Sequence, residues 1–345
     1  MFPPVNIEIY RIITKILIKL VILKGREVGL CLCFIVYLIK KNIILQIMFE
    51  ITTFINIIAQ MKIFLTILIL MTTLHSPAQD FLYAVAKEPT PVLNSPDFQS
   101  VFGGADSMTV KTDEQGLIRE MEFIALPGTV FNLLGEYEYV TYKIFKVECR
   151  EYEYNTDLFI DSRFVELKKK KPKERFIAVP TKEEIYKFLD NSVGSKYCWG
   201  GNFNSGITKL IELYKPKLSI SDELKSEWTL EGCDCSGLMY EATNGFTPRN
   251  TSKLIDYGET VEVEGLTAEE IAAKLKPLDM IVWLGHVIYV YDEKTSIQSG
   301  LSKGGVVKMD LVETLKEVME TRIPVNDYSA GKKERFVVRR WFNRE

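Results

Sequence analysis

The sequence predicts an α+β protein in which a small all-β domain precedes a domain built from a helix and an antiparallel sheet. Two observations support this fold class. Residues 80–167 contain short β-type runs separated by turn residues, which is typical of a small barrel or sandwich. Residues 181–345 begin with a helix signal and continue with apolar runs joined by tight turns. A lysine-rich stretch at 168–180 is the predicted linker.

The expected strands of the first domain are rich in β-branched and aromatic residues, and Gly, Pro or Asp turns bound them. They cover residues 108–112, 118–123, 129–134, 140–147 and 158–165. Several short strands at this spacing predict a small barrel or sandwich of about 85 residues.

The second domain carries its own start and turn signals. Thr181 and Glu184 form a predicted capping box ahead of an apolar helix face. A further helix is expected over 235–243, before an Asn-Gly stop. Apolar runs at 280–284 and 286–291, joined by a glycine, predict a β-hairpin.

The N-terminal 79 residues read as a targeting segment. In residues 61–79, a Met-Lys start is followed by an apolar run to Leu74 and a small-residue cleavage site at Ala78. This predicts a signal peptide and an exported, periplasmic or extracellular protein with no membrane partner beyond that signal. Residues 1–60 form a hydrophobic extension. It is either a membrane-anchoring segment or sequence upstream of a true start at Met61, and we favour the second interpretation.

The charge of the remaining chain excludes one class of partner. Residues 1–79 hold eight Lys or Arg and three Asp or Glu, which leaves 35 basic and 43 acidic residues in 80–345. Nucleic-acid binding needs clustered Lys and Arg, so an acidic body predicts no nucleic-acid partner. The one basic run, 168–175, contains a proline and is interpreted as a solvated linker.

Cys235 has the local setting of a catalytic thiol. It follows a Gly-Cys-Asp turn at the expected start of a helix, where free N–H groups favour a thiolate and can hold an oxyanion. The small residues Ser236 and Gly237 leave room for a substrate carbonyl. The alternative is that Cys235 is a small buried hydrophobic residue.

His286 is the expected base for this thiol. Removal of residues 1–79 also removes His75, so His286 is the one histidine left in the sequence. An isolated histidine in an apolar strand is often a structural residue, and this reading stays open. Gln298 follows the turn after that strand, on a strand expected to begin at Ile297, and could fix the imidazole tautomer. It could equally be a polar residue of an edge strand.

Together these residues resemble the NlpC/P60 peptidases of bacterial cell walls. The family's catalytic Cys and His match Cys235 and His286, and its third polar residue, usually His but also Asn or Gln, falls on Gln298. The motifs that carry the resemblance are Tyr197-Cys-Trp-Gly-Gly201, Asp234-Cys-Ser-Gly237, Pro248-Arg-Asn-Thr-Ser252, Leu278-Asp279 and His286-Val-Ile-Tyr289.

The resemblance implies a papain-like catalytic domain over 181–345 and an SH3-like barrel over 80–167. It implies a cysteine endopeptidase that cleaves peptidoglycan stem peptides, or released muropeptides, between γ-D-glutamate and diaminopimelate or lysine. No cofactor or metal is implied, and we expect a monomer. The substrate-binding residues implied by the matched motifs are Tyr197 and Asp234 at the peptide's amino end, Ser236 at the D-glutamate carboxylate, and Trp199 and Arg249.

The chain departs from the family pattern at two cysteines, Cys198 and Cys233. Together with Cys235 and His286 they make a Cys3His set, which is a zinc alternative with poor ligand spacing. In an exported chain a Cys198–Cys233 disulfide is the other alternative, and the state of Cys149 is open as well. Two further functions compete with the peptidase: a non-enzymatic wall-binding protein, and an amidase or acyltransferase that uses the same pair.

Overall fold

The protein is described from a computed structural model. It describes residues 11–12, 15–16, 18–19, 36–37, 40–41, 48–49, 51–66, 82–104, 106–329 and 334–343. The chain divides into two compact units, residues 1–78 and 79–345.

In the first unit, residues 51–66 are helical. Most of the predicted signal peptide, including the cleavage site after Ala78, lies outside the described residues, so that prediction stands untested. Among the residues described, no helix combines the length and the apolar composition that a membrane crossing requires.

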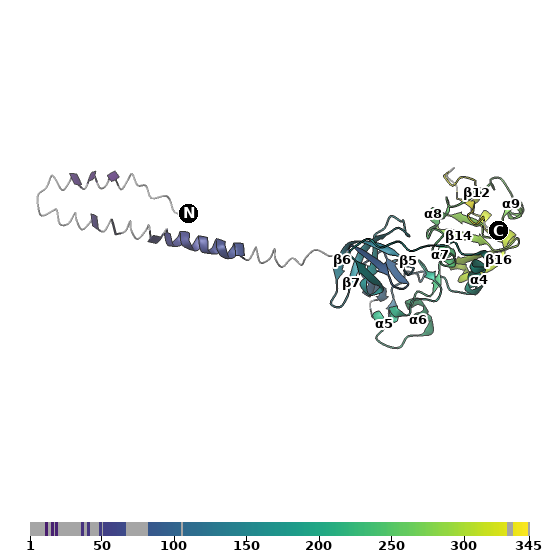
Figure 1. Cartoon of the computed structure of the whole chain (residues 1–345), viewed down its shortest axis with the longest axis horizontal. Coiled ribbons are helices and arrows are strands. Elements are labelled where there is room, and N and C mark those ends of the chain that lie inside the picture. Colours follow the sequence, from purple (N-terminus) through teal and green to yellow (C-terminus); the bar gives the residue numbers. More distant parts are fainter. Residues whose placement is uncertain are drawn as a thin grey trace. The chain divides into compact units, whose positions relative to one another are not determined.

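The second unit begins with a seven-stranded antiparallel sheet in the order β5-β2-β8-β7-β6-β1-β9. Figure 1 shows part of it in blue, with β5, β6 and β7 labelled. Its strands are β1 (Tyr83–Ala86), β2 (Thr90–Leu93), β5 (Met121–Ala125), β6 (Val130–Glu138), β7 (Lys143–Cys149), β8 (Leu158–Asp161) and β9 (Val165–Lys168). The end strands β5 and β9 are not paired with each other within the described residues, so the expected closed barrel is not found.

Four of the five predicted strand regions fall on β5 to β8, with shifted ends. The fifth, 108–112, contains only the two-residue strand β4 (Thr109–Val110), which pairs with β3 (Phe102–Gly103) after the short helix α3 (Phe98–Val101). Asp106 and Met108 form a local turn here, in which the Asp106 carboxylate accepts from the Met108 backbone N–H at 2.8 Å. Met108 is therefore part of a turn, whereas the sequence pattern had placed it in a strand over 108–112.

The first hydrophobic core also takes in residues from the second half of the chain. Leu210, Tyr214 and Trp228 pack with the side chains of the first sheet. The Tyr214 hydroxyl donates to the fully buried Asp161 carboxylate at 2.6 Å, and Arg163 completes this cluster. Residues that precede Cys235 in the chain therefore belong to the β-domain's core. The helices concerned are α5 (Lys209–Leu213) and α6 (Asp222–Trp228).

The second sheet has the order β12-β18-β13-β14-β15-β16. Its strands are β12 (Glu259–Val261), β13 (Met280–Trp283), β14 (His286–Val290), β15 (Thr295–Gly300), β16 (Gly305–Asp310) and β18 (Arg335–Arg340), with β17 (Ile323–Pro324) parallel to β18. The predicted hairpin is β13–β14, in which Trp283 pairs with His286, and the predicted third strand is β15.

The strands of this sheet carry apolar side chains on both faces, since successive residues of a strand point to opposite sides, and helices cover both faces. On one face, Met280 and Val282 of β13 share a core with α4 (Lys182–Ser192) and α7 (Cys235–Ala242). On the other face, Ile281 shares a core with α9 (Ala268–Lys274) and α10 (Leu311–Met319). The capping box at Thr181 and Glu184 is present at the start of α4, as predicted.

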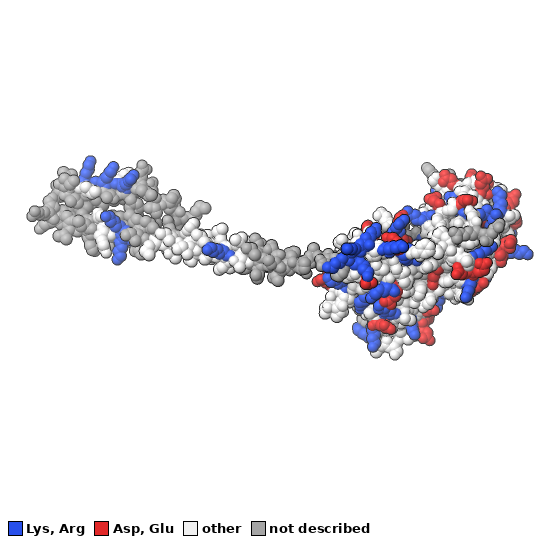
Figure 2. Space-filling view, in the orientation of Figure 1, with Lys and Arg blue, Asp and Glu red and all other residues white. Residues whose placement is uncertain are grey.

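Smaller elements join the two sheets. The ribbon β10 (Asn202–Phe203) pairs with β11 (Gly232–Cys233), directly before α7. Helix α8 (Thr251–Leu254) follows α7, and two short 3-10 turns cover Ser162–Phe164 and Leu301–Lys303. Both signs of charge are present over the face of the second unit that Figure 2 shows.

Candidate active site

Cys235 is the first residue of α7, and its backbone position is tightly fixed. The preceding Asp234 is the N-cap, and its side chain accepts from the Gly237 N–H at 2.7 Å. Gly237 has to be glycine, because a Cβ there would lie 2.0 Å from the carbonyl oxygen of Gly201. The Asp234 N–H donates to that same carbonyl at 2.9 Å. The start of α7 is thereby anchored on residues 201–203.

The thiol lies against the loop that leads into the histidine strand. Cys235 Sγ is 3.9 Å from the carbonyl oxygen of Gly285, which immediately precedes His286. The Gly285 N–H donates to Thr251 Oγ1 at 3.0 Å, and the Leu284 N–H donates to the Tyr328 hydroxyl at 3.0 Å. Two residues from outside the hairpin therefore hold its loop beside the thiol.

His286 and Gln298 are joined by a hydrogen bond between adjacent strands. His286 Nε2 lies 2.8 Å from Gln298 Oε1. An amide oxygen only accepts, so Nε2 carries the proton in this bond and Nδ1 keeps its lone pair. Gln298 is buried in the sheet rather than on an edge strand, with 5% of its surface exposed. The geometry fits a base whose tautomer is fixed by a neutral amide.

Burial sets the protonation of the pair. It raises the pKa of the Cys235 thiol to about 12, and the Asp234 carboxylate acts in the same direction. Burial also lowers the pKa of His286, while Gln298 and Asp234 partly oppose that shift. Both directions favour a resting pair of neutral thiol and neutral imidazole. This differs from the thiolate expected at a helix N-terminus, because burial raises the pKa of the thiol more than the backbone N–H groups of Val287 and Ser236 and the Arg249 charge lower it.

Arg249 is committed to protein partners. Its guanidinium pairs with the Asp234 carboxylate at 2.6 Å and donates to Ser236 Oγ at 2.9 Å and to Asn202 Oδ1 at 3.1 Å. Arg249 is buried, with 3% of its surface exposed. Arg249 therefore holds Asp234 and Ser236 in place. It also lines the cleft that opens at Cys235, and the substrate contact expected from its motif stays a prediction. The Ser236 hydroxyl also donates to Asp234, at 3.2 Å.

A cleft of about 540 Å³ opens at Cys235 between the two sheets. The second half of the chain contributes one wall, which includes the predicted residues Tyr197, Trp199, Asp234 and Ser236. Burial and the nearby Asp234 raise the pKa of Tyr197, so its hydroxyl stays protonated and can donate. The structure thus brings these four predicted residues to the same cleft as Cys235.

The opposite wall comes from the β-domain and was missed by sequence reasoning. Glu122 lies there, and its carboxylate accepts from Asn94 at 2.7 Å and from the Tyr152 hydroxyl at 2.6 Å. Arg119 places its guanidinium 4.4 Å from the centre of the Trp199 ring, across the cleft. No spacing in the sequence pointed to these residues, because only the packing of the two sheets brings them opposite Cys235.

Cys198 and Cys233 are neighbours in the fold. The Cys198 N–H donates to the Cys233 carbonyl at 3.2 Å, while the Cys198 side chain packs against the first core and the Cys233 side chain packs with Cys235 in the second. All of these thiols, and Cys149, are free in the structure, so the Cys198–Cys233 disulfide is not formed. Within the described part of the chain, no group of three or more His, Cys, Asp or Glu side chains is placed to hold a metal ion.

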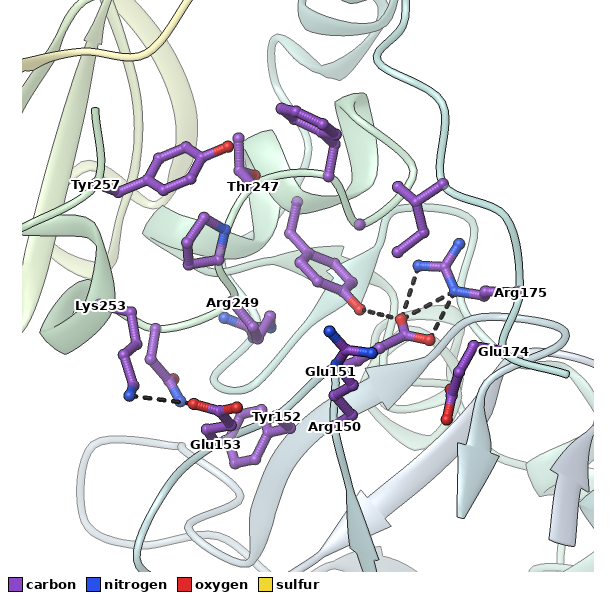
Figure 3. Close-up of a pocket in the computed structure, with 16 residues that line it drawn as sticks. Arg150, Glu151, Tyr152, Glu153, Glu174, Arg175, Thr247, Arg249, Lys253 and Tyr257 are labelled. Carbon is purple, nitrogen blue, oxygen red and sulfur yellow. Dashed lines mark hydrogen bonds and ion pairs between the residues drawn. The ribbon is translucent and has the colours of Figure 1, made fainter. Parts of the chain in front are cut away.

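A second cavity, of about 400 Å³, adjoins the cleft and shares Tyr152, Arg249 and Asn250 with it. Figure 3 shows Arg175 of the predicted linker pointing at Glu151 of the β-domain. Arg175 Nη2 pairs with Glu151 Oε2 at 2.7 Å, and the Tyr240 hydroxyl of α7 donates to the same oxygen at 3.0 Å. This buried cluster ties the linker and the β-domain to the helix of Cys235.

No protein-family model matches the sequence, and no curated protein is detectably similar to it. Solved structures do resemble the fold. An NlpC/P60 family protein from Bacillus cereus is 15% identical, with 67% of this chain and 59% of that chain covered and a TM-score of 0.27. The peptidoglycan hydrolase RipB from Mycobacterium tuberculosis is 19% identical, with 47% and 65% covered and a TM-score of 0.29. NlpC1 from Trichomonas vaginalis is 12% identical, with 78% and 96% covered and a TM-score of 0.32.

Two of these three solved structures have NlpC in their names. The chain spans less than two thirds of the Bacillus and Mycobacterium structures. Identity and TM-score are low throughout, so the roles of residues in this chain rest on its own contacts.

Proposed function

We propose that this chain is an exported cysteine endopeptidase that cleaves peptidoglycan stem peptides after γ-D-glutamate, with Cys235, His286 and Gln298 as its triad. The observation that carries the proposal is the 2.8 Å bond between His286 Nε2 and Gln298 Oε1, on a hairpin whose loop touches the Cys235 thiol. A histidine that was only a packed core residue would not need a buried amide to fix its tautomer beside a thiol.

The neutral resting pair supports a mechanism with general-base activation. As Cys235 Sγ attacks the γ-glutamyl carbonyl, its proton passes to His286 Nδ1, and the backbone N–H of Cys235 helps to hold the oxyanion. His286 then donates that proton to the leaving amine, and the C–N bond breaks to leave a thioester on Cys235. A water molecule, deprotonated by His286, attacks the thioester, and the thiol is released with its proton restored.

The charges of the cleft support a peptide with a free amino end as the substrate. Two carboxylates, Asp234 and Glu122, line the cleft, and Tyr197 belongs to the same lining. An ammonium group would be held there by charge-assisted hydrogen bonds. Arg119 also lines the cleft, but its guanidinium pairs with Asp113 at 2.5 Å and donates to Gln115 at 2.7 Å, so we assign it no substrate carboxylate. The β-domain, which we propose to be SH3-like despite its open sheet, is then part of the binding site.

The test is cleavage of L-Ala-γ-D-Glu-diaminopimelate by residues 80–345, followed by mass spectrometry beside the variant Cys235→Ala. The expected result is release of diaminopimelate by the unmodified protein alone. Equal cleavage by both proteins, or cleavage by neither, would overturn the proposal. A second substrate, the same tripeptide linked to N-acetylmuramic acid, distinguishes an amidase, which would release the whole peptide from the sugar. Binding of cell-wall sacculi without cleavage would indicate a wall-binding protein.

A further inference from the structure

Trp283 lies against the catalytic histidine from the facing strand. Trp283 of β13 and His286 of β14 are paired residues of the hairpin, and their ring centres are 5.1 Å apart with planes inclined at 49°. Nothing in the sequence analysis or in the proposed triad gives this tryptophan a role. Gln298 restrains only Nε2 of the imidazole, and it does so without charge, so the ring's orientation depends on what packs against its sides.

Arg322 in turn lies against Trp283. Its guanidinium carbon is 4.5 Å from the centre of the indole ring, which is within the range of a cation–π contact. Its other contacts are weak: Nη1 donates to Thr321 Oγ1 at 2.9 Å, next to it in the chain, and the exposed Glu334 is 3.8 Å away. Arg322 Nε is buried and has no hydrogen-bond partner in the described structure. A buried donor without a partner is costly, so the indole contact is the interaction that best explains this placement.

The positive charge of Arg322 also reaches the histidine. Burial is the main cause that lowers the pKa of His286, and Arg322 adds to that lowering, whereas Gln298 and Asp234 oppose it. The groups that act on the imidazole are therefore Gln298 from β15, Trp283 from β13, the Asp234 carboxylate at the N-cap of α7 and the positive charge of Arg322.

We propose that Trp283 and Arg322 form a positioning pair for the catalytic base: Arg322 fixes the indole, and the indole fixes the plane of the His286 imidazole. Neither residue has to touch the substrate. The inference rests on the proposed function for its activity assay, but it concerns the thiol–imidazole pair itself, which can be read without any peptide.

The first measurement uses the full chain and iodoacetamide, with alkylation of Cys235 followed by mass spectrometry from pH 4.5 to 9. Three variants are compared with the unmodified protein: Trp283→Leu, Arg322→Gln and Arg322→Lys. The matched control is Lys308→Gln, which removes another cation, one that lies 3.4 Å from the ring centre of Tyr291 on the same sheet. Thermal unfolding of each variant is recorded alongside.

For Arg322→Gln we expect the acid limb of the alkylation profile to move up by about half a pH unit, because removing a nearby cation makes the imidazole easier to protonate. Arg322→Lys keeps the charge and should restore most of that shift. Trp283→Leu should slow alkylation at neutral pH by about 10-fold, because the base is no longer held in line with the thiol. Lys308→Gln should leave the profile unchanged.

Profiles of Arg322→Gln and Trp283→Leu that superimpose on that of the unmodified protein would overturn the inference. If Trp283→Leu fails to fold, Trp283→Phe and the two Arg322 variants still decide it. Peptide cleavage is measured on the same samples, with kcat expected to fall and KM to stay constant. If the unmodified protein cleaves no peptide but the alkylation profiles shift as expected, the proposed function fails and the positioning pair stands.

Discussion

Arg249 Nη2 lies 2.6 Å from Asp234 Oδ2, and this buried ion pair sits directly behind the nucleophile. Asp234 is the N-cap of α7, the helix that begins at Cys235. By holding Asp234, Arg249 therefore also holds the start of this helix. Arg249 also donates to Asn202 Oδ1, and the same oxygen accepts from the Ile124 N–H of the first sheet at 2.8 Å. One guanidinium thereby links the active-site helix to the β-domain wall of the cleft.

Removing this arginine should destabilise the protein and distort the cleft together. We expect Arg249→Met to lower the free energy of unfolding by about 3 kcal/mol, because it leaves the Asp234 carboxylate without its partner in a low-dielectric site. Urea unfolding followed by circular dichroism measures the loss. Arg249→Lys is the control, because its ammonium group keeps the positive charge beside Asp234 but replaces only part of the two-pronged contact that the guanidinium makes. A loss below about 0.5 kcal/mol for Arg249→Met would show that Asp234 is solvated or otherwise paired.

Gln298 offers a direct test of the neutral orienting group. Gln298→Ala should lower kcat by about 10- to 100-fold with little change in KM, because the base loses its fixed tautomer. Gln298→Glu keeps the shape and the hydrogen bond but adds a negative charge, which favours the imidazolium. The acid limb of kcat/KM should therefore move to higher pH in Gln298→Glu. Unchanged kcat in Gln298→Ala would remove Gln298 from the triad.

The raised pKa of Glu241 predicts that the free energy of unfolding depends on pH. It is largely buried on α7, accepts from the Asn204 N–H at 2.8 Å, and its pKa is raised by burial to about 7. The folded state therefore binds a proton that the unfolded state has released, so the stability from this group is full below about pH 4.5 and is lost as pH rises through about 7. We expect Glu241→Gln to be more stable than the unmodified protein at pH 8, by up to about 3 kcal/mol, with little difference at pH 4.5.

Thermal unfolding at both pH values tests this expectation. The exposed Glu264→Gln is the control, and it should show no such divergence between the two pH values. A gain from Glu241→Gln that is the same at pH 4.5 and pH 8 would point to packing and not to ionisation.

The second cavity contains two ion pairs that differ strongly in burial, one between Arg175 and Glu151 and one between Lys253 and Glu153 (Figure 3). The side chains of Arg175 and Glu151 are 8% and 10% exposed, whereas those of Lys253 and Glu153 are 53% and 66% exposed. Arg175→Met should cost about 3 kcal/mol, and Lys253→Met less than about 1 kcal/mol. Urea unfolding compares the two, and equal costs would contradict the assignment of Arg175 as the tie between the linker and α7.

Sequence reasoning predicted the local elements well where the signal is local. The capping box at Thr181, the helix from Cys235 and the β13–β14 hairpin each depend on residues a few positions apart, and the structure contains all three. The predicted closed barrel was wrong, because closure of a sheet depends on residues that are far apart in the chain. The strands of residues 82–168 were expected to form a barrel, but whether the two end strands meet depends on what else packs there. Here α5 and α6 fill part of that core.

By itself, the sequence determined which residue types the chemistry can use: one thiol at a helix start, one histidine after residue 79, and an amide twelve residues later. It could not determine their protonation or their surroundings, because both depend on burial. Only the tertiary structure showed that burial raises the pKa of the Cys235 thiol, that Arg249 pairs with Asp234, and that Glu122 and Arg119 line the cleft at Cys235. The physical reason is that hydration and charge pairing act through space. Arg249 and Asp234 are 15 residues apart in the chain, and Glu122 and Cys235 are more than a hundred apart.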